Sequence, residues 1–188
     1  MECYIVFEGE INPINAKKLA DLILGINNDN KDNIAKINIF LSSYGGSTYY
    51  GFALATIIQN SSVPIVIHAT NHIDSIANVV FLAAKVENRT AESHAKFFVH
   101  GATQGGTYDL EGLIEAQSAI KTENHRIVTF ISENSALPID SVTSRMANRT
   151  SMPAAEAITV GYISESIHKT IPPGAKRYDI ISLPAPSE

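Results

Sequence analysis

The sequence predicts an α/β fold, because short apolar segments typical of strands alternate with segments that have the period of an amphipathic helix. The length of 188 residues suits a single domain, and 45% hydrophobic with 18% charged residues is the balance of a globular protein. We therefore expect one α/β domain over residues 1–188.

The first half of the chain contains three expected strand–helix pairs. Apolar and polar residues alternate in the second strand, and β-branched residues dominate the third. Asn12 is a typical N-cap, and Pro13 occupies the first helical position that proline favours. The third helix is almost wholly apolar and would be buried on all sides. The expected strands are residues 3–7, 36–41 and 64–69, and the expected helices are residues 13–26, 48–59 and 75–84.

The second half begins with a fourth expected strand, residues 95–99. A long, mostly polar helix over residues 108–135 follows, within a region of about 101–135 that we expect to protrude from the domain. Two shorter helices are expected over residues 138–147 and 153–160, each with proline at its first position. Residues 162–167 are expected to be extended. The tail over residues 171–188 contains four prolines, and we expect it to drape over the surface.

Composition and charge exclude several classes of function. The net charge is −5 and no run of four Lys or Arg residues occurs, so we expect neither nucleic-acid nor membrane-surface binding. A single cysteine, Cys3, excludes an internal disulfide and thiolate metal clusters, and the six histidines lack ligand spacing. We expect no metal and no cofactor. Without a secretion signal or a membrane span, the expected location is cytoplasmic.

Three local features lie at expected strand ends, where α/β proteins place their sites. Paired glycines, Gly45 and Gly46, allow backbone N–H groups to approach a ligand closely, although most such pairs are simple turns. Ser75 would open the apolar helix, where a serine is usually an N-cap but where free amides such as that of Ile76 stabilise an oxyanion. His100 closes the fourth strand, a place where histidine is most often structural or solvent-facing.

In this order, four segments resemble the Clp-type serine protease proteolytic subunit and its shorter Clp-like relatives in the crotonase-like superfamily. The segments are INIFLSSYGGS at residues 37–47, DSIAN at residues 74–78 leading into FLAA, AKFFVHG at residues 95–101, and MPAAEA running to VGYI at residues 152–163. The resemblance covers roughly residues 4–167, and the separation of Ser75 from His100 suits the family.

This resemblance implies a fold of repeated strand–strand–helix units and a serine peptidase site. Ser75 would be the nucleophile and His100 the general base, with the N–H groups of Gly46 and Ile76 forming the oxyanion hole. The long helix matches the family's handle, which interdigitates between two stacked rings. The implied partners are a peptide or unfolded protein substrate and further copies of the same chain.

The sequence departs from the family pattern at the third member of the triad. The position that should hold Asp falls on Arg149, flanked by Asn148 and Thr150. Asn148 is the candidate for orienting the imidazole, and a Ser–His dyad is an equal alternative. Asp74 stands where the family has a small residue, and its carboxylate could instead act on His100.

Three classes of function follow from these observations. The first is a serine endopeptidase that cuts peptides or unfolded polypeptides inside an oligomeric ring chamber. The second is a non-catalytic Clp-like assembly subunit that has lost the triad Asp, and the third is a crotonase-like acyl-CoA enzyme. The family's ATPase unfoldase is a doubtful partner, because the chain begins at its first strand and we expect no N-terminal docking segment.

Overall fold

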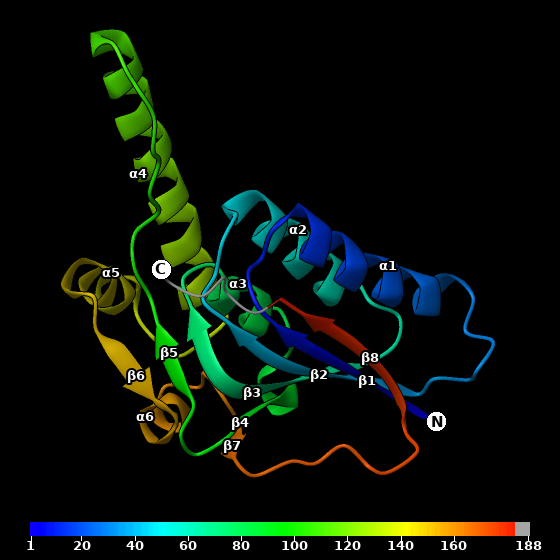
Figure 1. Cartoon of the computed structure of the whole chain (residues 1–188). Coiled ribbons are helices and arrows are strands. Elements are labelled where there is room, and N and C mark those ends of the chain that lie inside the picture. The colour runs from blue at the N-terminus through cyan, green and yellow to red at the C-terminus, as the bar shows by residue number, and fades with distance from the viewer. Residues whose placement is uncertain (183–188) are drawn as a thin grey trace, which may run out of the picture.

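The computed structural model describes residues 1–182 and confirms the α/β class (Figure 1). Strands and helices alternate along most of the chain. The strands are β1 (Glu2–Glu8), β2 (Lys36–Ser43), β3 (Ile65–Asp74), β4 (Arg89–Ala91), β5 (Lys96–Phe98), β6 (Ser151–Pro153), β7 (Glu165–Ser166) and β8 (Lys176–Ile181). The helices are α1 (Pro13–Asn28), α2 (Thr48–Gln59), α3 (Ala77–Leu82), α4 (Leu110–Glu133), α5 (Ile139–Asn148) and α6 (Ala154–Thr159), with a 3-10 turn, η1, at Val86–Asn88.

The strands form one sheet in the order β6-β5-β3-β2-β1-β8, with β4 pairing β3 and β7 at its side. Every pair is parallel except β5 with β6. The main strands therefore end on the same edge of the sheet. In parallel sheets this carboxyl edge is where ligands bind, and all the candidate site residues at strand ends lie there.

Helices α1, α2 and α3 cover one face of the sheet and pack against each other in that order (Figure 1). The Asn12 side chain caps α1, because its Oδ1 accepts from the Asn15 N–H at 2.9 Å. Leu19 and Ile23 of α1 are fully buried against the sheet, as the helical spacing predicts. The apolar α3 is buried along its whole length.

Helix α4 leaves the body of the molecule and projects away from it, as expected for residues 101–135 (Figure 1). Asp109 caps it by accepting from the Gly112 N–H at 2.8 Å. The base of the helix is anchored in the core by Ile127 and Ile131. Its far end leaves three large apolar side chains mostly exposed: Leu110, Leu113 and Ile114.

The structure corrects two expectations. The tail does not simply drape over the surface, because residues 176–181 form β8 and pair in parallel with β1; residues 183–188 of the predicted tail lie outside the described residues. The third strand does not end at residue 69 as expected, because β3 continues to Asp74 and its last residues pair with β5. No helix within residues 1–182 is long and apolar enough to cross a lipid bilayer.

Candidate active site

Ser75 occupies a tight turn between the end of β3 and the start of α3. Its φ of +56° places it in the left-handed region, which non-glycine residues seldom adopt. The Ser75 N–H donates to the Phe98 carbonyl at 2.8 Å, which ties the turn to β5. The helix begins at Ala77, so the expected N-cap geometry at Ser75 is replaced by a strand-to-helix turn. Such a turn exposes a serine hydroxyl beside the free amides of the helix.

His100 follows β5 and has its tautomer fixed by the backbone. Its Nδ1 lies 2.8 Å from the Gly101 carbonyl oxygen. A carbonyl oxygen only accepts hydrogen bonds, so Nδ1 carries the proton and donates it. The lone pair of the neutral ring therefore resides on Nε2, the nitrogen that a general base would use.

Ser75, His100 and Gly46 line the same cavity, which has a volume of about 460 Å³. The Gly45–Gly46 turn forms one wall, and the segment that leads into α4 forms another. Within residues 1–182 no hydrogen bond joins Ser75 Oγ to His100. Catalytic hydrogen bonds are often loose in a free enzyme and tighten when substrate binds.

The two glycines of the turn are required by their surroundings. Their φ values are +96° and +140°, and a Cβ added to Gly45 would lie 2.5 Å from Ser75 Cβ. The turn is held by Ile11, whose N–H donates to the Gly45 carbonyl at 2.8 Å. Among the described residues, the N–H groups of Gly46 and Ile76 have no recorded acceptor. One free amide therefore lies in the glycine turn and a second directly follows Ser75, and paired amides of this kind suit an oxyanion hole.

Asp74 adds a buried carboxylate directly before Ser75. Burial raises the pKa of Asp74, and the positive charges of His72, Lys96 and His100 oppose that rise. Asp74 Oδ2 lies 3.7 Å from His72 Nδ1, and Asp74 Oδ1 is buried with no hydrogen-bond partner in the described part of the chain. The carboxylate therefore lies beside His72 without a hydrogen bond to it.

The structure does not bring Asn148 to His100. Asn148 ends α5, where its exposed side chain donates to Ser144 Oγ at 3.2 Å, and it does not line the catalytic cavity. The hydrogen bond that an orienting residue would make to His100 Nδ1 is made by the Gly101 carbonyl instead.

A network of buried hydrogen bonds supports the Ser75 turn, and we did not predict it from the sequence. Asn78 is fully buried, and its Nδ2 donates to the carbonyls of Ser75 at 2.9 Å and Phe98 at 3.0 Å. The Tyr162 hydroxyl donates to Asn78 Oδ1 at 3.0 Å. The network ties the Ser75 turn to the strand that leads to His100. The only signal in the sequence was a polar residue inside an otherwise apolar helix.

Comparisons with known proteins identify the family and the fold of this chain. The family model described as Clp protease matches residues 1–170. The chain belongs to the Clp protease family. Members of this family are serine peptidases, so the match supports that general class of enzyme.

Two Clp relatives and one solved structure show how far the similarity extends. The chain is 29% identical over 144 residues to the ATP-dependent Clp protease proteolytic subunit of Porphyromonas gingivalis, covering 75% of this chain and 64% of that subunit. It is 28% identical over 169 residues to the subunit of the same name from Bacteroides fragilis, covering 88% of this chain and 79% of that one. A point mutant of ClpP1 from Listeria monocytogenes superimposes with a TM-score of 0.78 at 20% identity, over 88% of this chain and 91% of that one.

The match therefore spans less than two thirds of the length of the Porphyromonas subunit. The structural likeness shows a shared Clp fold. In the portion of the chain that the structure covers, no group of three or more His, Cys, Asp or Glu side chains is placed to hold a metal ion.

Proposed function

We propose that the protein is a serine endopeptidase that hydrolyses peptide bonds of peptides or unfolded polypeptides inside an oligomeric ring chamber. One observation carries the proposal: a strained serine, a histidine with a free Nε2 and a glycine turn with a free amide line one cavity. These are the nucleophile, the base and the oxyanion donor of acyl transfer.

Each group has a defined part in the reaction. Ser75 Oγ attacks the carbonyl carbon of the scissile bond while His100 Nε2 takes the hydroxyl proton. The negative charge that develops on the carbonyl oxygen accepts hydrogen bonds from the N–H groups of Gly46 and Ile76. The imidazolium then donates its proton to the leaving amine, and water hydrolyses the acyl-enzyme by the reverse sequence.

The support of His100 by a carbonyl sets the expected rate. Like a carboxylate, the Gly101 oxygen accepts from Nδ1–H and keeps the productive tautomer. A neutral oxygen stabilises the imidazolium less than a charged one does, because charge-assisted hydrogen bonds are roughly twice as strong. We therefore expect turnover that is slower than that of a Ser–His–Asp triad.

A fluorophosphonate probe tests the proposal, because it phosphonylates only activated serines. Intact-mass spectrometry of the wild type should show a single adduct, and the adduct should be lost in Ser75→Ala and His100→Ala. Ser47→Ala is the matched control, because Ser47 lines the same cavity and its loss should leave the adduct in place. An adduct that persists in Ser75→Ala would contradict the assignment of the nucleophile.

A non-catalytic assembly subunit is the second candidate function. The observation in its favour is that no carboxylate is hydrogen bonded to His100 within residues 1–182. A wild-type protein that forms rings, yet gives no adduct and cleaves no peptide, would establish this second function. The exposed apolar end of α4 is the surface that we propose to join the rings.

A further inference from the structure

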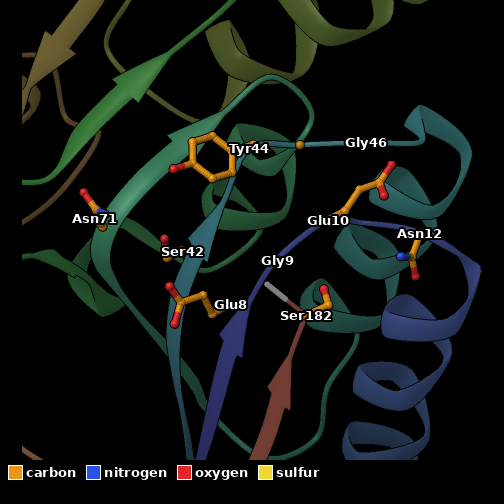
Figure 2. A pocket seen from close by; sticks show the side chains of 10 residues that line it. Glu8, Gly9, Glu10, Asn12, Ser42, Tyr44, Gly46, Asn71 and Ser182 are labelled. Carbon is orange, nitrogen blue, oxygen red and sulfur yellow. The ribbon is translucent and has the colours of Figure 1, made fainter. Parts of the chain in front are cut away.

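A second cavity, of about 760 Å³, opens beside the catalytic one at the carboxyl ends of the strands (Figure 2). We call it the strand-end cavity. It shares Tyr44 and Gly46 with the catalytic cavity, so the Gly45–Gly46 turn separates the two. Its walls are the ends of β1, β2 and β8 and the last part of β3. The lining residues are Glu8, Gly9, Glu10, Asn12, Ser42, Tyr44, Gly45, Gly46, Asn71 and Ser182.

The strand-end cavity is negatively charged. Its lining includes the carboxylates of Glu8 and Glu10 and no Lys, Arg or His. Among the ion pairs and side-chain hydrogen bonds of residues 1–182, neither carboxylate has a partner. The Glu10 side chain lies against the Gly45–Gly46 turn, because a Cβ placed on Gly46 would be 2.9 Å from Glu10 Cγ. A cation bound here would therefore be close to the scissile bond.

A mostly buried serine points to a ligand independently of the carboxylates. Ser42 is only 7% exposed and lines the cavity, and its Oγ makes no hydrogen bond within residues 1–182. The hydroxyl is open to the cavity and free to accept a hydrogen bond from a ligand there. Ser42 and Glu8 are register partners on β2 and β1, so their side chains are neighbours on one face of the sheet (Figure 2). Together they offer a neutral and a charged oxygen to the same N–H donor group.

We infer that the strand-end cavity binds a basic side chain of the substrate, a lysine ammonium or an arginine guanidinium. This inference rests on the proposed peptidase function and adds a preference to it. Both cations carry several N–H donors, which suits the acceptor oxygens of Glu8, Glu10 and Ser42. A polypeptide that passes over the glycine turn would place one residue against Ser75 and a near neighbour in the strand-end cavity.

The preference for a basic side chain is tested with matched peptides that carry lysine or Nε-acetyl-lysine at one position at a time. Acetylation removes the positive charge and keeps the aliphatic part of the lysine side chain. The peptides of the first set are N-acetylated, and those of a second set have a free amino terminus. At one position near the scissile bond, we expect kcat/KM for lysine to exceed that for acetyl-lysine by about tenfold at low salt. In the double variant Glu8→Gln, Glu10→Gln the ratio should fall close to one. Glu87→Gln, an exposed carboxylate away from both cavities, is the control and should keep the wild-type ratio.

A binding measurement separates failure of this inference from failure of the proposed function. Fluorescence anisotropy with Ser75→Ala protein gives the Kd of the same labelled peptides without any turnover. A lysine preference in Kd that depends on Glu8 and Glu10 supports the cation site even if no peptide is cleaved. Equal affinities at every position, or a preference that survives in the double variant, would overturn it. So would discrimination that follows the free amino terminus and not the lysine side chain.

Discussion

Asp74 is the residue whose charge state most directly links stability to pH. Burial raises the pKa of Asp74, so between its unfolded and folded pKa values the folded protein binds more protons than the unfolded chain. Its contribution to stability is therefore fully present at acid pH and is lost as the pH rises through the folded pKa. Above that pKa a buried, incompletely paired carboxylate remains beside the nucleophile.

Replacing Asp74→Asn should raise the melting temperature more at pH 8 than at pH 4, because the cost of burying a charged carboxylate applies only above the raised pKa of Asp74. Differential scanning calorimetry across this range measures both values. The same variant should lose peptidase activity, because the positive charge that His100 gains in the transition state loses a nearby anion. A melting temperature that falls at pH 8 but not at pH 4 would show that the Asp74 charge stabilises the fold and would contradict this prediction.

Glu92→Gln is a suitable control for the pH dependence of the melting temperature, because the pKa of Glu92 is shifted in the opposite direction to that of Asp74. Hydrogen bonds from His68, the Lys169 backbone and His168 lower the pKa of Glu92 despite the opposing effect of burial. Its contribution to stability is present above the unfolded pKa and is lost as the pH falls through the folded one. The control should therefore lower the melting temperature at pH 8.

At the scale of elements, the Asn78 network holds α3, β5 and the segment after α6 in one arrangement. Tyr162→Phe removes the hydroxyl that donates to Asn78 Oδ1 and leaves a buried acceptor unpaired. The free energy of unfolding should fall by about 1–3 kcal/mol in urea titration. Tyr49→Phe is the matched control, because Tyr49 is 74% exposed and its substitution should change the free energy of unfolding little.

A loss of activity larger than the loss of stability would show that the network also positions Ser75. If Tyr162→Phe unfolds at the same urea concentration as the wild type, the hydrogen bond from Tyr162 to Asn78 makes no net contribution to the free energy of unfolding.

The sequence alone was sufficient to predict the strands and helices whose signals lie within a few neighbouring residues. Strands β1 and β2 and helices α1, α2 and α4 lie within about two residues of their expected bounds, because caps, periodicity and glycine turns are short-range signals. Strand β8 was missed because its partner, β1, is at the opposite end of the chain. The positive φ of Ser75 was missed for a similar reason, since contacts with Phe98 and Gly45 impose it. The support of His100 by Gly101 depends on a backbone carbonyl, which residue identity cannot reveal.

At the scale of the whole molecule, the projecting α4 predicts assembly. Ile114 is 62% exposed near the free end of the helix, and a large apolar side chain there favours contact with another copy. Sedimentation velocity at micromolar concentration should show the wild type larger than one chain, and Ile114→Glu should shift it toward the monomer. Val86→Glu, at an apolar residue that is 42% exposed on η1, is the control. A wild type that sediments only as a monomer would contradict this role of α4.

The pairing of β8 with β1 also sets the order in which the molecule can be built. Cys3 lies opposite Lys176, so β1 must wait for a partner strand that is translated much later in the chain. Until then the outer edge of β1 is an unpaired template for other nascent chains. Parallel contacts between such distant segments form slowly. Co-translational folding should therefore begin with β1, β2 and β3 under their helices, and β8 should close this edge of the sheet later.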